Sequence, residues 1–288
     1  MKTLDIDFIS DTHIDFWIKE KNVSNKLNIL VEEYVKTILK PKGNKVLVIA
    51  GDLGHYFVQD TAVLLELKKY YKHLILVRGN HDMYLVSNAQ QAKYDKSSSK
   101  RVNEMKEFCL NNDIYYLDGD TVNIDGFKFG GVGMWYDLPN IGDIDKWNHV
   151  MNDSNLIMEG STPVRFQYGY GGYYKSSQWD TQGYYLKEVQ KLKDLVPQNI
   201  DVLVTHISPI IIPDKYLKTE YRGDPNNIFY CSDNLSVIKD IDPEVVIFGH
   251  THSSYDFDLE EQWFVCNPLG YKGERTGNEI QQITLVKY

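Results

Sequence analysis

The sequence predicts an α/β protein in which a parallel β-sheet is covered by helices on its faces. In the first half of the chain, short apolar runs at residues 4–10, 45–50 and 73–78 are typical of buried strands. Apolar residues at helical spacing fill the segments between these runs, over residues 27–39 and 59–72. Strands that alternate with amphipathic helices indicate a parallel sheet with helices on its faces.

The same pattern returns late in the chain. Residues 201–205 and 244–248 are again typical of buried strands, and we expect a closing antiparallel set over residues 255–259, 263–265 and 280–286. A further helix is expected over residues 102–110, after a short polar linker at residues 96–100. Residues 134–182 fit neither period and are rich in glycine and aromatic residues. We therefore interpret them as an insertion or cap within a single domain that spans residues 1–288.

Composition excludes several classes of protein. Of 288 residues, 42% are hydrophobic and 25% are charged, which excludes collagen-like, disordered and disulfide-scaffold proteins. A formal net charge of -9 disfavours proteins that coat duplex DNA. The three cysteines are widely spaced and form no C-x-x-C pair, so we expect reduced thiols. With no signal-peptide pattern and no long apolar run, we expect a cytoplasmic protein with no membrane partner and no obligate protein partner.

Five short segments place Asp, Asn or His directly after a predicted strand. They are Asp11-Thr12-His13, Gly51-Asp52, Gly79-Asn80-His81-Asp82, Thr205-His206 and Gly249-His250-Thr251-His252. Ligands of open α/β sheets bind beyond the carboxyl ends of the strands, so these segments predict one site built from distant parts of the chain. Asp or Asn after a strand is also a common turn former, but the joint occurrence of all five segments favours a shared site.

The residue types at these strand ends indicate a metal site. Carboxylate, imidazole and amide oxygen, without thiolate, suit borderline or hard divalent metals such as Mn, Fe, Zn or Ni. Asp52 follows a glycine at the end of a strand, so its carboxylate could bridge two metals about 3.5–4 Å apart. Such a pair lowers the pKa of a bridging water from 15.7 towards about 7 and supplies hydroxide at neutral pH.

The order of these motifs carries a family resemblance. D-x-H, G-D, G-N-H-D, a lone His after a strand and G-H-x-H, from Asp11 to His252, resemble the calcineurin-like metallophosphoesterase superfamily. Residues 130–137, Met151-Asn152-Asp153 and the segment from Cys266 to Tyr271 are similar to motifs of bacterial and phage single-domain metallophosphoesterases. The resemblance implies an α/β fold of four layers, an α/β/β/α metallophosphoesterase sandwich with an aromatic-rich insertion.

The resemblance also implies a role for each residue of the site. Two divalent metal ions are expected, with Mn²⁺ the first choice and Fe, Zn or Ni as alternatives. One ion would be held by Asp11, His13 and His252, with Asp52 bridging, and the second by Asn80, His206 and His250. His81 would not be a ligand but would protonate the leaving oxygen, so His81 and Asp52 are the expected catalytic residues.

One departure from the superfamily concerns the second motif. In the protein-phosphatase branch this motif continues with Asp-Arg, where this chain has His55 and Tyr56. The His–Asp pair of that branch and its phosphate-gripping arginine are therefore missing, which disfavours phosphoprotein phosphatase activity. Asp82 is a candidate to orient His81 instead. His55 is a candidate second proton donor or substrate contact, with an ordinary loop histidine as the alternative.

Candidate substrate contacts are His55, Arg78, Trp135 and Arg222. A guanidinium matches phosphate oxygens with two parallel hydrogen bonds, but an arginine taken alone is more often a solvated surface charge. Eight aromatic residues lie between residues 166 and 185, namely Phe166, Tyr168, Tyr170, Tyr173, Tyr174, Trp179, Tyr184 and Tyr185. They would stack nucleobases, form a mobile cap over the site, or hold a small satellite core together.

These observations lead to one main hypothesis and two alternatives. The main hypothesis is a dinuclear-metal-dependent phosphodiesterase for small nucleotide-type substrates, in which a metal-bridging hydroxide attacks phosphorus in line and His81 assists the leaving group. The first alternative is a nuclease for single-stranded DNA or RNA, because residues 51–55 are similar to the second motif of double-strand-break repair nucleases. The second is a non-catalytic, metal-binding regulatory protein.

Overall fold

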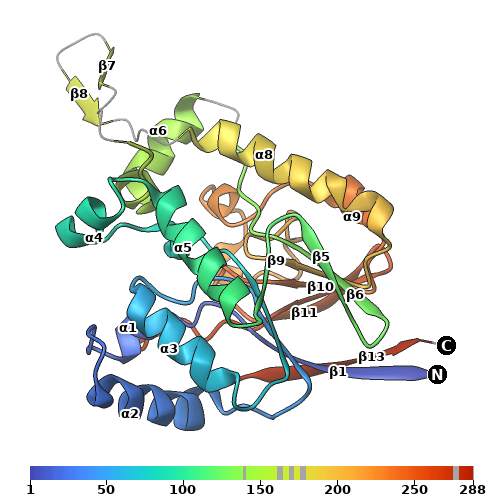
Figure 1. The fold of residues 1–288 in the computed structure, drawn as a ribbon. Helices are drawn as coiled ribbons and strands as arrows, with labels where there is room; N and C mark the ends of the chain where they lie inside the picture. The colour runs from blue at the N-terminus through green and yellow to red at the C-terminus, as the bar shows by residue number, and fades with distance from the viewer. Residues whose placement is uncertain (139–140, 161–164, 169–171, 176–179, 275–278, 288) are drawn as a thin grey trace.

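The computed structural model describes residues 1–138, 141–160, 165–168, 172–175, 180–274 and 279–287. Within these residues, two large β-sheets lie face to face between outer layers of helices (Figure 1). The space between the sheets is filled by buried residues of both, such as Val48 and Ile75 from one sheet and Val204 and Ile247 from the other. The expected four-layer α/β/β/α arrangement is confirmed.

The first sheet has the strand order β13-β1-β2-β3-β4. Its strands are β1 (Lys2–Ile9), β2 (Val46–Ile49), β3 (His73–Val77), β4 (Tyr115–Leu117) and β13 (Gln281–Lys287). Strands β1 to β4 run parallel to one another, and β13 pairs antiparallel with β1. The residues of β2 are buried on both faces, which explains the continuous apolar run that predicts this strand.

The second sheet has the strand order β11-β12-β10-β9-β6-β5. Its strands are β5 (Asp120–Ile124), β6 (Phe127–Val132), β9 (Val202–Thr205), β10 (Val245–Phe248), β11 (Tyr255–Leu259) and β12 (Gln262–Cys266). The central strands β12, β10, β9 and β6 are parallel, and the edge strands β5 and β11 are antiparallel to their neighbours.

The expectation of one closing antiparallel set is wrong in its arrangement. Strands β11 and β12 form an antiparallel hairpin, but β12 also pairs in parallel with β10. Strand β13 joins the other sheet beside β1, because its buried residues Ile283 and Leu285 face the core between the sheets. An alternating apolar pattern predicts a strand with one buried face, but it does not say which sheet that strand joins.

The helices are α1 (Ile14–Trp17), α2 (Asn25–Tyr34), α3 (Phe57–Leu67), α4 (Asn88–Lys93), α5 (Ser98–Asn111), α6 (Ile141–Val150), α7 (Asp153–Leu156), α8 (Thr181–Asp194) and α9 (Leu235–Ile241). In Figure 1, α2 and α3 cover the first sheet, and α8 and α9 lie on the opposite side, against the second. Helix α5 begins earlier than expected because the Ser97 hydroxyl caps it by accepting from the N–H of Lys100. Part of the expected polar linker is therefore the first turn of this helix. No helix in the described residues is long and apolar enough to cross a lipid bilayer.

The expected insertion contains α6, α7 and a hairpin of β7 (Arg165–Tyr168) and β8 (Gly172–Lys175). Its described part packs on the same core as α8, through buried residues such as Trp135, Tyr136 and Trp147. Of the eight aromatic residues noted above, Tyr184 and Tyr185 lie in α8. The side chains of the other six lie outside the described residues.

Candidate metal centre and active site

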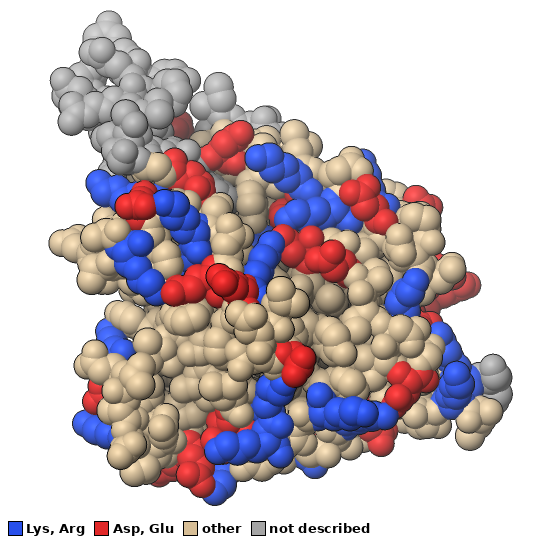
Figure 2. All heavy atoms as spheres, in the orientation of Figure 1, with Lys and Arg blue, Asp and Glu red and all other residues tan. Residues whose placement is uncertain are grey.

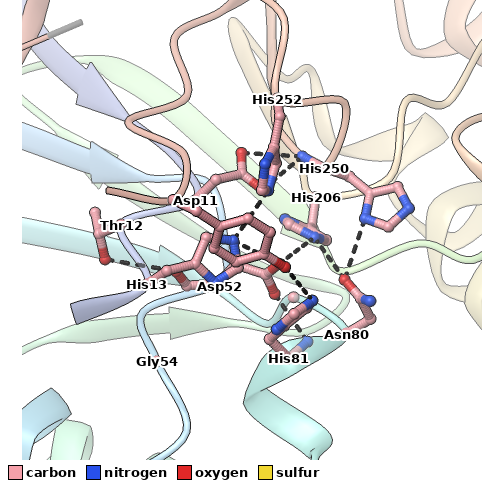
Figure 3. Close-up of polar contacts among 12 residues, drawn as sticks. Asp11, Thr12, His13, Asp52, Gly54, Asn80, His81, His206, His250 and His252 are labelled. Atoms are coloured by element: carbon pink, nitrogen blue, oxygen red, sulfur yellow. Dashed lines mark hydrogen bonds and ion pairs between the residues drawn. The ribbon is translucent and has the colours of Figure 1, made fainter. Parts of the chain in front are cut away.

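The loops that follow β1, β2, β3, β9 and β10 meet at one edge of the two sheets (Figure 3). They bring together all of the residues predicted as metal ligands, which are Asp11, His13, Asp52, Asn80, His206, His250 and His252. All are buried except His252, whose side chain is 19% exposed. Because parallel strands end on the same side, both sheets deliver polar groups to one place.

The backbone is in a left-handed conformation at most of these positions. Asp11, His13, Asp52, His250 and His252 have φ values of 52°, 39°, 58°, 69° and 50°. Each such non-glycine residue costs roughly 1 kcal/mol or more and persists only where its surroundings hold it. Here the N–H of His250 donates to both carboxylate oxygens of Asp11, at 3.0 and 3.1 Å. The backbone of the site residues is therefore strained, and contacts such as these hold it in place.

At two positions of the motifs, the backbone packs so closely against a ligand side chain that only glycine fits. A Cβ added at Gly79 would overlap the carboxylate of Asp52, and one added at Gly51 would overlap the ring of His206. Gly51 also has a φ of 85°, which disfavours any side chain. These glycines allow the loops after β2 and β3 to pack directly against the ligand side chains.

Asp11, His13 and His252 form the first group of donor atoms. Nε2 of His13 lies 3.0 Å from Nε2 of His252, which lies 3.6 Å from Oδ1 of Asp11. The second group contains Asn80, His206 and His250. Oδ1 of Asn80 lies 3.0 Å from Nε2 of His206 and 3.1 Å from Nδ1 of His250.

Asp52 lies between the two groups. Its Oδ2 is 3.7 Å from Nε2 of His13 in the first group and 3.3 Å from Nε2 of His206 in the second. One carboxylate oxygen is therefore within reach of both groups.

Outer partners determine which imidazole nitrogen faces the site. Nδ1 of His206 donates to the carbonyl oxygen of Ala50 at 2.8 Å, and Nε2 of His250 donates to that of Phe229 at 2.9 Å. Nδ1 of His252 lies 2.6 Å from Oε2 of Glu274, to which it donates. Since each of these nitrogens carries the hydrogen, the opposite nitrogen presents a lone pair to the shared space.

Burial and the nearby carboxylates change the pKa values of the histidines in opposite directions. Burial lowers the pKa of His13 and of His250 well below the usual histidine value, which favours the neutral, ligating form. For His206, burial opposes the charged form, but the carboxylates of Asp52 and Asp11 outweigh it and raise the pKa to about 9. The same two carboxylates would attract a divalent cation to this place.

These residues fit a divalent-metal centre. The donors are imidazole nitrogens with carboxylate and amide oxygens, the set that suits borderline divalent metals. With metal–ligand bonds of about 2.0–2.2 Å, two donors on one ion lie roughly 3–3.5 Å apart. The 3.0 Å separations from His13 to His252 and from His206 to Asn80 have this length.

His81 lies beside both groups. Its backbone N–H donates to Oδ1 of Asp52 at 2.9 Å, and its ring shares a third cluster of potential ligand atoms with His13 and Asp52. Nδ1 of His81 lies 2.8 Å from Nε2 of His55, and its Nε2 lies 3.4 Å from the hydroxyl of Tyr271. Burial and then the nearby His13 lower the pKa of His81 well below its usual value.

Comparison with known proteins decides the family. The sequence model of the calcineurin-like phosphoesterase family matches residues 4–254. The chain belongs to the calcineurin-like phosphoesterase family. No curated protein matches the sequence.

Of two solved structures that resemble this phosphoesterase, the one with the higher TM-score supports the fold. The phosphopantetheinyl hydrolase of Mycobacterium tuberculosis has a TM-score of 0.65 at 17% identity, over 96% of this chain and 95% of that chain. A novel archaeal phosphodiesterase has a TM-score of 0.34 at 14% identity, over 98% of this chain and 100% of that chain.

Asp153 is a site residue to which the sequence analysis assigns no role. Its Oδ1 accepts from Nδ2 of Asn80 at 2.8 Å and from the hydroxyl of Tyr84 at 2.5 Å, and its Oδ2 accepts from the hydroxyl of Tyr136. Because the amide nitrogen of Asn80 is bound on this side, its oxygen must face His206 and His250. The Met-Asn-Asp motif is the sequence signal for this residue, although its partner lies 73 positions away.

Asp82 does not orient His81, so that prediction is wrong. Its carboxylate accepts from the backbone N–H groups of Gly79 at 2.7 Å, Asp52 at 3.0 Å and Leu53 at 3.1 Å. All of its contacts tie the loop after β3 to the loop after β2. Arg101 of α5 joins the same two loops, because its guanidinium donates to the carbonyl oxygens of His81 and Gly54 at 2.9 and 2.8 Å.

The structure also corrects two of the expected substrate contacts. Arg78 is 3% exposed, and its guanidinium donates to the buried carboxylate of Glu188 at 2.8 Å, away from the cleft. Trp135 is fully buried in the core and donates to the Thr181 hydroxyl at 2.8 Å. Arg222 lies in an exposed loop, where it donates to the carbonyl oxygen of Leu217 at 3.1 Å. Its role in substrate binding stays a proposal, since Arg222 itself does not line the cavity described next, whereas its partner Leu217 does.

A cavity of about 340 Å³ opens beside the centre. His250 and His252 form part of its wall, together with Tyr271 and Glu274. The remaining wall comes largely from residues 211–231, between β9 and α9, and includes Leu217 and Tyr230. A group attached to a phosphate at the centre would therefore have space in this cavity.

The first prediction concerns Asp153. In Asp153→Ala, the amide of Asn80 loses the acceptor that fixes its orientation, so affinity for one of two metal ions should fall about 10- to 100-fold. Calorimetric titration of the apo-protein with Mn²⁺ measures this. Asn155→Ala, on the exposed side of the same short helix, is the matched control and should bind as the wild type does. Unchanged binding of both ions in a folded Asp153→Ala protein would contradict this role.

The second prediction concerns Arg78. Glu188→Ala would leave its guanidinium buried without its carboxylate partner, so the free energy of unfolding should fall by about 3–5 kcal/mol. Urea denaturation measures the change, with Gln190→Ala on the exposed face of α8 as the control. A loss below about 1 kcal/mol would show that Arg78 does not depend on this pair.

Proposed function

We propose that this phosphoesterase is a dinuclear-metal-dependent phosphodiesterase that acts on small nucleotide-type substrates. The observation that carries the proposal is the position of Asp52, whose Oδ2 lies within 3.7 Å of one ligand group and 3.3 Å of the other. A carboxylate shared in this way suits a two-metal centre.

The proposed ligands follow the two groups. Asp11, His13 and His252 would hold one ion, and Asn80, His206 and His250 the other, with Asp52 common to both. When bound, the two ions activate water for attack at neutral pH and neutralise the phosphoryl oxygens. Mn²⁺ is the metal we propose first, and Fe, Zn and Ni are alternatives for the same nitrogen and oxygen donors.

His81 is the proposed proton donor to the leaving oxygen. Its Nδ1 is occupied by His55, so its Nε2, on the side of Tyr271, is the nitrogen free to reach a substrate. The negative charge of a bound phosphate favours the imidazolium form of His81, which can protonate the departing alkoxide as the P–O bond breaks, a role that contributes about 10²- to 10⁴-fold to the rate.

The lining of the cavity favours a substrate in which the phosphate carries an organic group without negative charge. Its wall contains the rings of Tyr221, Tyr230, Tyr255 and Tyr271, and its charged residues are Asp224 and Glu274. No Lys or Arg is found among the described residues that line it. Aromatic faces stack nucleobases, whereas two carboxylates repel a second phosphate. A nucleoside fits this chemistry better than a further stretch of nucleic acid.

The nuclease alternative finds less support in these features. Binding of single-stranded nucleic acid relies on basic groups that follow the phosphates. On the face shown in Figure 2, Lys and Arg side chains are interspersed with Asp and Glu, and the whole chain carries a formal charge of -9.

The third prediction tests this function. Apo-protein refilled with Mn²⁺ should hydrolyse bis(p-nitrophenyl) phosphate faster than p-nitrophenyl phosphate. It should also cleave 2′,3′-cyclic nucleotides, whose leaving group is an alkoxide. Replacing His81 by Ala should slow hydrolysis of the cyclic nucleotide about 100-fold or more, because its alkoxide leaving group needs a proton.

The other outcomes are equally informative. Faster cleavage of the monoester would replace the diesterase proposal with a phosphomonoesterase. Steeply salt-dependent binding and cutting of single-stranded DNA would favour the nuclease. Tight metal binding without turnover of any ester, in Mn²⁺ or in Zn²⁺ and Ni²⁺, would favour a regulatory protein.

A further inference from the structure

A row of three hydrogen-bonded side chains leads from Asp15 to His81. Oδ2 of Asp15 lies 2.8 Å from Nδ1 of His55, and Nε2 of His55 lies 2.8 Å from Nδ1 of His81. Asp15 is 9% exposed and His55 is 8% exposed, so water competes little for these contacts. The row begins at α1 and crosses the loop after β2 before it reaches the loop after β3.

The direction of the hydrogen bonds follows from what each atom can do. A carboxylate can only accept, so Nδ1 of His55 carries the hydrogen that is donated to Asp15. When His55 is neutral, its Nε2 has only a lone pair and accepts the Nδ1–H of His81. Oδ1 of Asp15 also accepts the backbone N–H of His55, at 3.2 Å, so both of its oxygens are committed to this residue.

Packing holds the row in place. The ring of Tyr84 lies against both imidazoles, with its centroid 4.3 Å from that of His81 and 5.5 Å from that of His55. The carbonyl oxygen of His55 accepts from Nε2 of Gln90 at 2.5 Å. Arg101 ties the backbones of Gly54 and His81 together, as described above. Neither ring is free to turn without breaking several of these contacts.

We propose that Asp15 and His55 are positioning residues that keep the Nδ1–H of His81 on the side of His55, so that Nε2 delivers the proton to the leaving alcohol. As the P–O bond breaks, its electron pair stays on the leaving oxygen, and the proton on Nε2 moves to that oxygen to form the alcohol. His81 is left neutral, still donating from Nδ1 to His55, and Nε2 regains its proton from the water molecule that becomes the attacking hydroxide of the next turnover. The row takes the place of the His–Asp pair that the second motif of this chain lacks.

This inference rests on the proposed role of His81, and a leaving-group comparison tests it. The two substrates are thymidine 5′-(p-nitrophenyl phosphate), whose phenolate departs without a proton, and thymidine 5′-(methyl phosphate), whose leaving alkoxide needs one. In His55→Phe, kcat for the methyl ester should fall about 30- to 100-fold, while kcat for the aryl ester changes less than roughly threefold. Asp15→Asn should show the same selectivity. Gln at this position can donate to Asp15 and accept from His81, so His55→Gln should keep kcat for the methyl ester within roughly threefold of the wild-type value.

A double variant of His55 and His81 shows whether His55 acts through His81 or independently of it. If His55 acts only by positioning His81, then His55→Phe should cause no further loss in a His81→Ala background. Metal content by elemental analysis should be unchanged in all of these variants. Tyr56→Phe alters the next residue, whose hydroxyl contacts only Lys21 among the described residues, and should behave as the wild type.

Three results would overturn the inference. Equal losses on both esters in His55→Phe would indicate general damage to the site, and additive losses in the double variant would show that His55 acts independently. If His81→Ala itself leaves kcat for the methyl ester unchanged, the proposed role of His81 fails together with this inference. Metal-dependent hydrolysis would still stand in that case, so the two failures can be told apart.

Discussion

The carboxylate of Asp52 is buried between two sets of imidazole nitrogens, and an uncompensated buried charge is expensive. Its Oδ2 faces His13 and His206, while its Oδ1 accepts the backbone N–H of His81. The surrounding structure is organised to keep this group in place. The left-handed backbone at Asp52 and the absence of a side chain at Gly79 both serve its position. A cation bound between the two groups would compensate the charge of Asp52.

Around this carboxylate, further layers of contacts hold the loops and then the rings. Asp82 and Arg101 join the loops after β2 and β3 through backbone groups. Asp153 fixes the amide of Asn80 and is itself bound by Tyr136, whose hydroxyl also accepts from Trp147 of α6. The segment expected to be an insertion is therefore connected to the centre through hydrogen bonds. Its proposed role as a cap is compatible with this connection.

Much of this protein follows from its sequence, for reasons that are physical. Buried parallel strands produce continuous apolar runs, and the ligands directly after them must meet at one edge of the sheets. Both signals are local, so the α/β class and the site segments were predictable. The sheet that β13 joins was not, because an alternating pattern identifies a buried face without identifying its partner.

Contacts between residues that are far apart in the sequence could not be predicted from local patterns. Asp15 binds His55 across 40 positions, and Asp153 binds Asn80 across 73, so neither pair has a local pattern. Arg78 was misjudged because it precedes the Gly79-Asn80-His81-Asp82 motif and could therefore have faced the cleft. The structure instead turns its side chain towards Glu188, which lies 110 positions later in the chain.

The central claim is that one carboxylate serves two metal ions, and metal stoichiometry tests it most directly. Wild-type apo-protein titrated with Mn²⁺ should bind two ions per chain. The isosteric variant Asp52→Asn should lose affinity for both ions together, by about 100-fold or more, because each ion loses a charged ligand. Circular dichroism and urea denaturation would show that the variant is folded. Loss of only one ion, with the other bound as in the wild type, would contradict the account.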